Sequence, residues 1–301
     1  MKVLVLGASG FLGSEICAAF IRNGHTVVGA TRSADKTKQL EANEVISLVA
    51  DPADPKTWEH VVADVDCVID AIGGATIKEI GNTVLETVKR EAAKSRPQGP
   101  PLSFIYTGGT WLHGDDHDPP FGSLSDLSPI TKPNAVTAWR KEHEIAVLGA
   151  KSVSLAPNVV RPSLLYGRSG SITASWMETA HEGHVKVAGK SDARLATCHV
   201  DDAASMFVLV AEKALIVQGV VFDASNPYPE SLAFILERLA HVAKAKGPTF
   251  SKPTNDFERA ITSTDILRPT LGKTLLGWEA KRPPLAEGME TYYKAFLASV
   301  A

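Results

Sequence analysis

The chain of 301 residues carries 31 Lys and Arg against 34 Asp and Glu, and this near balance, without a long run of like charge, argues against a nucleic-acid or membrane-surface partner. Apolar residues make up 44% of the chain and charged residues 22%, as in soluble globular proteins, which excludes a disordered chain. The longest nearly apolar run, residues 203–211, is too short to cross a bilayer, so we expect a soluble, cytoplasmic protein whose length accommodates two lobes.

Short β-rich runs alternate with helix-length amphipathic segments in the first half of the chain. Strands are predicted at residues 2–6, 26–30, 45–49, 67–70, 102–106 and 154–160. Helices are predicted between them at residues 11–23, 58–63, 80–94 and 134–148. The strands are nearly unbroken runs of β-branched and aromatic residues, as expected where a sheet is covered on both faces. This alternation predicts an α/β fold with a Rossmann-like, doubly wound parallel sheet.

The pattern changes after residue 160. Turns rich in Gly, Ser and Pro separate shorter elements, with helices predicted at 203–214 and 231–245 and a strand at 220–222. We therefore expect a Rossmann domain at residues 1–160 and a smaller C-terminal lobe on the substrate side at residues 161–301. Some segments of the second part are candidates to return to the first sheet.

A glycine-rich turn directly follows the first predicted strand and opens the first helix. Its sequence, GASGFLG at residues 7–13, has the spacing G-x-x-G-x-x-G. Such a turn brings backbone N–H groups close to a pyrophosphate, and the helix N-terminus adds its partial positive charge. The strand before it and the helix after it favour a dinucleotide site over an ordinary turn. We expect the pyrophosphate to be held by Gly7, Ser9, Gly10, Phe11, Leu12 and Gly13.

The end of the second strand indicates which dinucleotide binds. An NAD site usually places an acidic residue there to hold the ribose 2′-hydroxyl. Here the sequence reads GATRS at residues 29–33, and the next carboxylate is Asp35. The guanidinium of Arg32 is suited to a 2′-phosphate, so NADP(H) is favoured over NAD(H). Asp51, after the third strand, is a candidate contact for the adenine amino group, and a plain turn role explains it equally well.

Six motifs in chain order resemble those of the short-chain dehydrogenase/reductase superfamily, in its atypical or extended NAD(P)-dependent epimerase/dehydratase-like branch. They are GASGFLG (7–13), VIDAIGG (68–74), FIYTGGTWLHG (104–114), VRPSLLYG (160–167), CHVDDA (198–203) and LLGW (275–278). The resemblance spans nearly the whole chain and implies the fold and a nicotinamide cofactor. It further implies that Ile72 and Gly73 wall the ribose and that residues 107–110 face the nicotinamide.

The catalytic residues of that family are not all present. The resemblance implies a tyrosine four residues before a lysine on the long helix after the fifth strand, the tyrosine exchanging a proton with the substrate while the lysine holds the ribose. With Lys141 as the family lysine, the tyrosine position holds Thr137. With Glu144 as the family's following glutamate, Arg140 takes the lysine place and Val136 the tyrosine place. Neither register contains a tyrosine.

Another group must supply the proton if the protein is an enzyme, because threonine does not ionise near pH 7. His113 has the most suitable intrinsic pKa, although a solvated loop histidine is the simpler interpretation. Tyr166 matches a family position near the nicotinamide. The candidate catalytic residues are Thr107, Thr110, His113, Arg140, Lys141 and Tyr166. Thr107 and Lys141 are also candidate cofactor contacts.

Two histidine-rich segments have the composition of metal sites. HGDDHD at residues 113–118 and HEGH at residues 181–184 hold potential ligands, yet neighbouring ligands on a loop rarely converge without a scaffold, so no metal is expected. Aromatic residues on the substrate side are candidates for an apolar substrate pocket, and core packing explains them equally well. They are Trp111, Trp139 and Trp176, joined by Phe121 and Met177.

These patterns predict an NADP(H)-dependent oxidoreductase that reduces a small to medium, apolar carbonyl compound or oxidises the corresponding alcohol. Two alternatives remain open. One is a non-catalytic NADP(H) sensor that has lost its chemistry with the tyrosine, and the other is an epimerase or isomerase that uses the nicotinamide transiently. We expect a small-molecule substrate and a monomer or homodimer.

Overall fold

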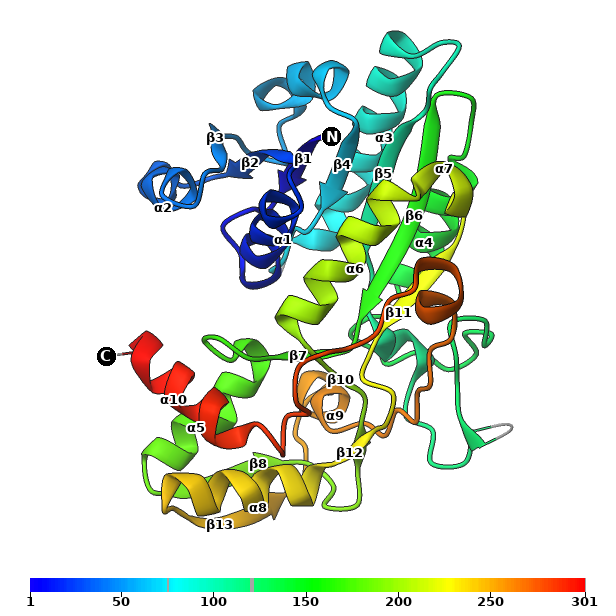
Figure 1. The fold of residues 1–301 in the computed structure, drawn as a ribbon. Coiled ribbons are helices and arrows are strands. Elements are labelled where there is room, and N and C mark those ends of the chain that lie inside the picture. Colours follow the sequence, from blue (N-terminus) through cyan, green and yellow to red (C-terminus); the bar gives the residue numbers. More distant parts are fainter. Residues whose placement is uncertain (75, 120–121, 301) are drawn as a thin grey trace. The chain divides into compact units, whose positions relative to one another are not determined.

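The computed structural model describes residues 1–74, 76–119 and 122–300, and its first half alternates strands with helices (Figure 1). The strands are β1 (Lys2–Leu6), β2 (Thr26–Thr31), β3 (Ile46–Val49), β4 (Cys67–Asp70), β5 (Leu102–Thr107) and β6 (Leu155–Pro162). The α-helices are α1 (Phe11–Arg22), α2 (Thr37–Glu41), α3 (Ile77–Ser95) and α4 (Arg140–Gly149). Short 3₁₀ turns lie at Pro55–Thr57, Glu59–Asp64 and Thr110–His113.

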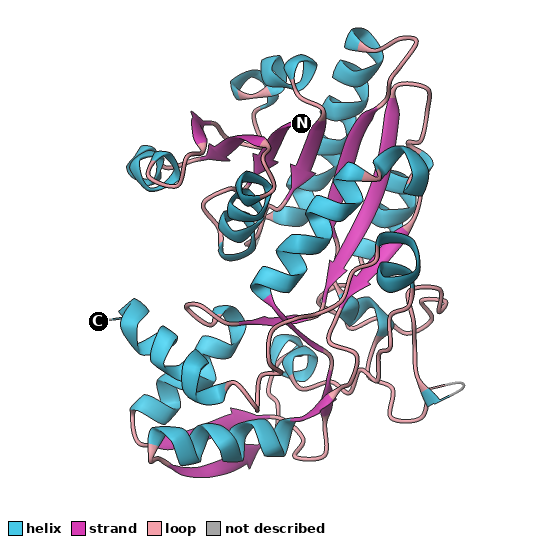
Figure 2. Ribbon diagram, viewed as in Figure 1, coloured by secondary structure: helices cyan, strands magenta, loops and turns pink. Residues whose placement is uncertain are grey.

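The later strands are on average shorter than the earlier ones, and loops and turns separate the elements (Figure 2). The strands are β7 (Leu164–Tyr166), β8 (His184–Ala188), β9 (Arg194–Leu195), β10 (Thr197–His199), β11 (Val221–Ala224), β12 (Glu230–Ser231) and β13 (Lys246–Ser251). The helices are α5 (Ala174–His181), α6 (Val200–Glu212), α7 (Ala214–Val217), α8 (Leu232–Ala243), α9 (Asp256–Ile261) and α10 (Met289–Val300), with a π-helical turn at Gly272–Leu276. Within the described residues, no helix combines the length and apolar character that crossing a membrane requires.

Seven strands form one sheet in the order β11-β6-β5-β4-β1-β2-β3, and the pairs from β3 through to β6 are parallel. All four residues from Val3 to Leu6 are fully buried, which requires cover on both faces of the central strand. The doubly wound α/β fold is therefore confirmed. The strand order reverses between β1 and β4, and in such sheets a crevice forms at that point, outside the carboxyl ends of the strands.

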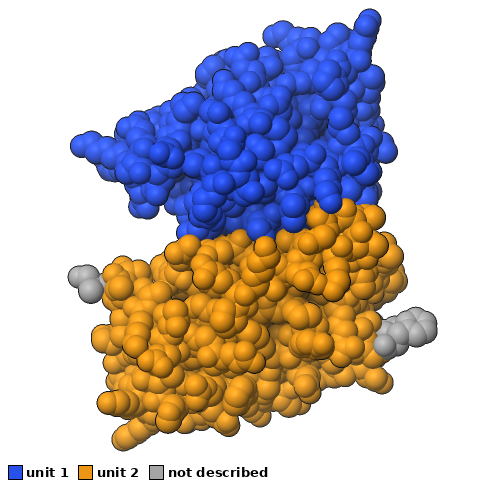
Figure 3. Space-filling view, viewed as in Figure 1, with its two compact units in different colours: residues 1–108, 139–160, 204–222 blue, residues 109–138, 161–203, 223–301 orange. Residues whose placement is uncertain are grey.

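The chain divides into two compact units (Figure 3). Unit 1 comprises Met1–Gly108, Trp139–Val160 and Ala204–Phe222, and unit 2 comprises Gly109–Ala138, Arg161–Ala203 and Asp223–Ala301. The two units differ in two places from the expected division at residue 160. The segment after β5 belongs to unit 2, and most of α6 with all of α7 belongs to unit 1, because these helices lead into β11, which adds to the edge of the sheet.

Two predicted helices differ from the observed ones. The helix expected at residues 134–148 begins only at Arg140, and a chain of turns precedes it, with the Thr137 N–H donating to the Asn134 carbonyl at 2.9 Å. The segment expected as a helix at residues 58–63 is a 3₁₀ turn. Residues 58–63 are too few to form an α-helix without tertiary support, and at residues 134–139 successive turns replace the first turns of the expected helix.

Candidate nucleotide-binding site

A cavity of about 310 Å³ lies in unit 1 where β1, β2 and β4 end and α1 begins. Its position is the point where the strand order reverses, the usual ligand crevice of open α/β sheets. Its walls are formed by Gly7, Ser9, Gly10, Ala30, Thr31, Arg32, Ala50, Pro52, Ala71, Ile72, Gly73, Gly74, Thr76 and Ile80. The predicted cofactor residues Gly7, Ser9, Gly10, Arg32, Ile72 and Gly73 are among them.

The three glycines of the turn serve different purposes. Gly7 has φ +85°, and a Cβ atom there would lie 2.6 Å from the Ala71 carbonyl oxygen, so only glycine fits. A Cβ atom at Gly13 would lie 2.1 Å from the Gly7 carbonyl oxygen, so this glycine permits close packing of α1 on the turn. At Gly10 the nearest atom to a Cβ would be the same oxygen at 3.2 Å, and the residue lines the cavity.

The first turn of α1 fits a bound pyrophosphate. Gly10 is the N-cap of this helix, and its N–H donates to the Gly7 carbonyl at 3.0 Å. Among the described residues, no side chain caps the helix, and its first turn holds no acidic residue, so N–H groups of that turn remain for an anion. A dinucleotide would be held by the backbone N–H groups of Phe11 and Leu12 and by the Ser9 hydroxyl, with Gly10 leaving room for it.

The adenosine end of the cavity contains no acidic side chain among its described lining residues. Thr31 ends β2, and its hydroxyl lies 2.9 Å from the Ser9 hydroxyl. Arg32 follows directly and is exposed. Asp51 is not among the lining residues, and its Oδ1 accepts from the Ala53 N–H at 3.0 Å. This contact is that of a turn aspartate, and the adenine contact of Asp51 stays a prediction.

A buried polar network lies next to the cavity, at the carboxyl ends of β4 and β5. The Asp70 Oδ1 accepts from the N–H of Ile72, a cavity residue, at 3.1 Å. Burial raises the pKa of Asp70 to about 6, although the Ile72 N–H and the charge of Arg140 oppose this shift. The Arg140 guanidinium donates to the Tyr106 hydroxyl and to the Thr107 carbonyl. Arg140 thus points inward, whereas Lys141 is exposed, which favours the register with Glu144 over that with Lys141.

The sequence reasoning missed Asp70 and Tyr106 as members of this site. Both are polar residues near the carboxyl ends of neighbouring strands, and they are register partners in the β4–β5 pair. That placement was a usable signal, since polar side chains at this edge of a parallel sheet converge on the ligand crevice.

His113 is not the solvated loop histidine of the simpler interpretation. Its side chain is fully buried in unit 2, with Nε2 2.8 Å from Asp223 Oδ2. Burial lowers the pKa of His113, but the Asp223 and Asp265 carboxylates outweigh it, and the net pKa lies above the ordinary value. Burial raises the pKa of Asp265 to about 7, and the charge of His113 opposes this shift. His113 ends the 3₁₀ turn that follows β5, Asp223 lies in β11 and Asp265 follows α9. Their interactions hold these three segments together, which is a structural role.

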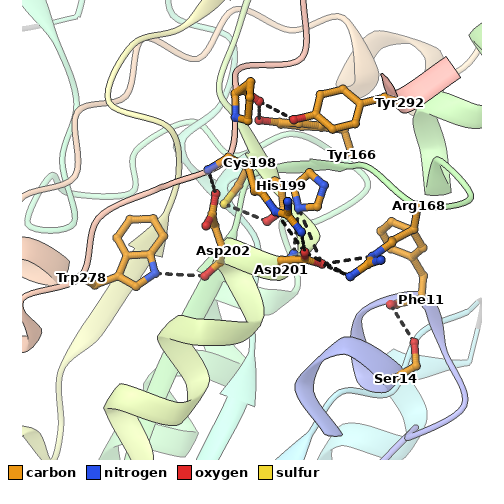
Figure 4. Close-up of polar contacts among 12 residues, drawn as sticks. Phe11, Ser14, Tyr166, Arg168, Cys198, His199, Asp201, Asp202, Trp278 and Tyr292 are labelled. Atoms are coloured by element: carbon orange, nitrogen blue, oxygen red, sulfur yellow. Dashed lines mark hydrogen bonds and ion pairs between the residues drawn. The ribbon is translucent and has the colours of Figure 1, made fainter. Parts of the chain in front are cut away.

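Tyr166 is also fully buried in unit 2. Its phenol lies beside that of Tyr292 (Figure 4). Its hydroxyl donates to the Pro283 carbonyl at 2.8 Å and accepts from Asn226 at 3.2 Å. The ring meets the edges of His199 and Tyr292, at 5.3 and 5.1 Å between centroids. Burial raises its pKa well above the ordinary value. These contacts bind β7 to the C-terminal segment, and they are unfavourable for a proton donor; catalysis by Tyr166 stays a prediction.

The aromatic residues of the predicted substrate pocket belong to both units, and the pocket stays a prediction. Trp176 and Met177 belong to the buried core of unit 2, and Trp111 packs against that core and against Phe257, 6.0 Å away between ring centroids. Trp139 lies in unit 1, and Phe121 lies outside the described residues. For Trp176 and Met177, core packing is the role that the structure shows. Within residues 1–74, 76–119 and 122–300, no group of three or more His, Cys, Asp or Glu is arranged to hold a metal ion.

Comparison with known proteins identifies the class to which this fold and site belong. The model of the NAD dependent epimerase/dehydratase family matches residues 3–223, and the chain belongs to that family. Among curated proteins, it is 28% identical to a 2-alkyl-3-oxoalkanoate reductase of Stenotrophomonas maltophilia, over 79% of this chain and 74% of the relative. It is also 28% identical to a 3-beta-hydroxysteroid dehydrogenase of Mycolicibacterium neoaurum, over 70% of this chain and 61% of the relative.

Solved structures of the same fold cover almost all of the chain. A UDP-glucose 4-epimerase of Thermotoga maritima, bound to UDP-glucose, superposes with a TM-score of 0.83 at 18% identity, covering 100% of both chains. A UDP-glucuronic acid 4-epimerase variant of Bacillus cereus, in complex with NAD, superposes with a TM-score of 0.80 at 19% identity, covering 99% of this chain and 100% of the other. At these identities the likeness shows the fold alone.

Proposed function

We propose that this protein is an NADP(H)-dependent oxidoreductase that reduces a small to medium, apolar carbonyl compound or oxidises the corresponding alcohol. The observation that carries the proposal is the cavity of unit 1, which is lined by the glycine turn at the α1 N-terminus and by Arg32. The two curated relatives, named as a reductase and a steroid dehydrogenase, support redox chemistry on an apolar substrate. A cytoplasmic monomer or homodimer fits this role.

The choice of NADP(H) rests on the residues at the end of β2. The solved relatives include proteins bound to NAD, which favours NAD(H) by analogy. In this chain, however, the cavity holds Thr31 and Arg32 and no described acidic residue that could accept from a ribose 2′-hydroxyl. The exposed guanidinium of Arg32 supplies a fork of N–H donors for a 2′-phosphate.

When bound, the nicotinamide cofactor would supply or accept the hydride. The residues of this chain would bind and orient the cofactor. The α1 N-terminus would bind the pyrophosphate and Arg32 the 2′-phosphate, and Ile72 and Gly73 would line the site beside the ribose. Arg140, which takes the lysine place of the family pattern, would hold the second ribose. Positions 136 and 137, where the two registers place the family tyrosine, hold Val and Thr and precede α4, so another group must supply the proton.

The experiment is calorimetric titration of the wild type and Arg32→Ala with NADPH and with NADH. A charge-assisted pair contributes about 1.5–3 kcal/mol, so NADPH should bind about tenfold or more tightly than NADH, and Arg32→Ala should remove most of that preference. Arg22→Ala, at the far end of α1, is the matched control. Equal affinities in the wild type would refute the choice of cofactor. Tight NADPH binding without turnover of any apolar ketone would favour the alternative of a non-catalytic sensor. Formation of product without net consumption of NADPH would favour the alternative of an epimerase.

A further inference from the structure

Tyr106 and Arg140 form a phenol–guanidinium contact at the carboxyl edge of the sheet in unit 1. Tyr106 is the second-last residue of β5 and Arg140 is the first residue of α4. The Nη1 group of Arg140 donates to the Tyr106 hydroxyl and, at 2.9 Å, to the Thr107 carbonyl. The guanidinium carbon also lies 4.8 Å from the centroid of the Trp139 ring. Three neighbours therefore fix the direction of this side chain.

The phenol is itself held rigidly. The Tyr106 ring is buried and meets the His143 ring edge-on, 4.7 Å away between centroids. His143 in turn places Nδ1 3.0 Å from Asn82 Oδ1, and it packs so close to α3 that a Cβ atom at Gly81 would lie 3.0 Å from its Nε2. A buried hydroxyl costs free energy unless it is bonded, and a phenylalanine would fill the same space. The hydrogen bond with Arg140 therefore explains why a tyrosine, with its hydroxyl, suits this buried position.

This contact lies where the second half of a dinucleotide would extend. The cavity spans the ends of β1 and β2 and reaches Ile72 and Gly73 after β4. A dinucleotide crosses the point of strand-order reversal, so its second nucleotide lies over the strands beyond β4, the next of which is β5. Asp70 connects the two places, since it accepts from the Ile72 N–H and its charge interacts with that of Arg140.

We propose that Tyr106 is a positioning residue of the cofactor site, whose hydroxyl holds the Arg140 guanidinium ready to bind the ribose of the nicotinamide half. The proposal rests on the dinucleotide function proposed above. Within the described residues, both hydrogen bonds of Arg140 come from Nη1, which leaves the Nε and Nη2 donors for ribose hydroxyls. A guanidinium is a planar fork, so its orientation decides whether it meets two hydroxyls, and an ammonium group would need no such support.

The test compares two ligands on Tyr106→Phe. NADPH contains the nicotinamide ribose, and 2′,5′-ADP contains the adenosine half without it. In calorimetric titrations, Tyr106→Phe should bind NADPH about tenfold more weakly than the wild type and should bind 2′,5′-ADP unchanged. Tyr228→Phe is the matched control, because Tyr228 also has an arginine over its ring, with the Arg268 Cζ 5.7 Å from the centroid, but is exposed in unit 2. It should bind both ligands as the wild type does.

A double-mutant cycle tests whether the hydroxyl acts through the guanidinium. Arg140→Gln should weaken NADPH at least as much as Tyr106→Phe, and the double variant should be no weaker than Arg140→Gln alone. Unchanged NADPH affinity in Tyr106→Phe overturns the proposal, and so does an equal loss for NADPH and 2′,5′-ADP, since the hydroxyl would then support the fold in general. If the wild type prefers NADH, the same comparison with NADH and ADP tests Tyr106 separately from the choice of cofactor.

Discussion

Gly10→Val is the substitution that best distinguishes loss of ligand binding from loss of folding. Gly10 lines the cavity and has φ −79° and ψ 170°, a backbone conformation that valine adopts without strain. A side chain there would occupy the space between the glycine turn and the first N–H groups of α1. We therefore expect a folded protein that no longer binds a dinucleotide.

The two magnitudes follow from the local geometry. The added Cβ would lie 3.2 Å from the Gly7 carbonyl oxygen, a contact relieved by a shift of a few tenths of an ångström at a cost of about 1 kcal/mol. Replacing the N-cap glycine by valine costs about 1 kcal/mol more. Loss of two charge-assisted bonds from backbone N–H groups to the pyrophosphate, at about 1.5–3 kcal/mol each, weakens NADPH by about two to four orders of magnitude.

Calorimetric titration with NADPH gives the affinity, and thermal unfolding gives the state of the fold. Gly149→Val is the matched control, because a Cβ atom there would meet no described atom outside its own helix within 4 Å and the residue ends α4 away from the cavity. It should retain wild-type affinity. A folded Gly10→Val protein that binds NADPH within about threefold of the wild type would refute the assignment of the glycine turn to the pyrophosphate.

Two further predictions concern buried side chains. Burial raises the pKa of Asp70 from 3.8 to about 6, although the Ile72 N–H and the charge of Arg140 oppose this shift. The folded chain therefore binds this proton more readily than the unfolded chain does. As a result, the free energy of unfolding falls as the pH rises from about 4 to about 6. Asp70→Asn should lack about 3 kcal/mol of this pH-dependent fall, as measured by urea unfolding between about pH 4 and 8. If the free energy of unfolding depends on pH in the same way in both proteins, this prediction is wrong. Tyr166→Phe, which loses the bonds to Pro283 and Asn226, should lower the free energy of unfolding by about 1–3 kcal/mol and leave single-turnover reduction within about twofold. A rate loss of about a hundredfold at unchanged stability would place this phenol in the chemistry instead.

The parts of the fold that the sequence predicted are those encoded locally. Five of the six strands of the first half lie within one residue of their predicted ends, because an apolar run between turn residues identifies a buried strand without knowledge of its neighbours. The sixth, β6, extends to Pro162, two residues beyond the expected end. The glycine turn was readable for the same reason, since the strand, the turn and the helix that form it are contiguous.

Tertiary structure decided which distant residues meet. Tyr106 reaches Arg140 across 34 positions of the chain, and His113 reaches Asp223 across 110. No local period encodes such pairs, because they depend on how the strands are ordered and on where each helix begins. The start of α4 at Arg140 turns this arginine inward and leaves Lys141 exposed, and the return of α6 and α7 to unit 1 defines the edge of the sheet. The sequence alone therefore identified the nucleotide turn, and only the packing of strands and helices around it brought Asp70, Tyr106 and Arg140 together beside the cavity.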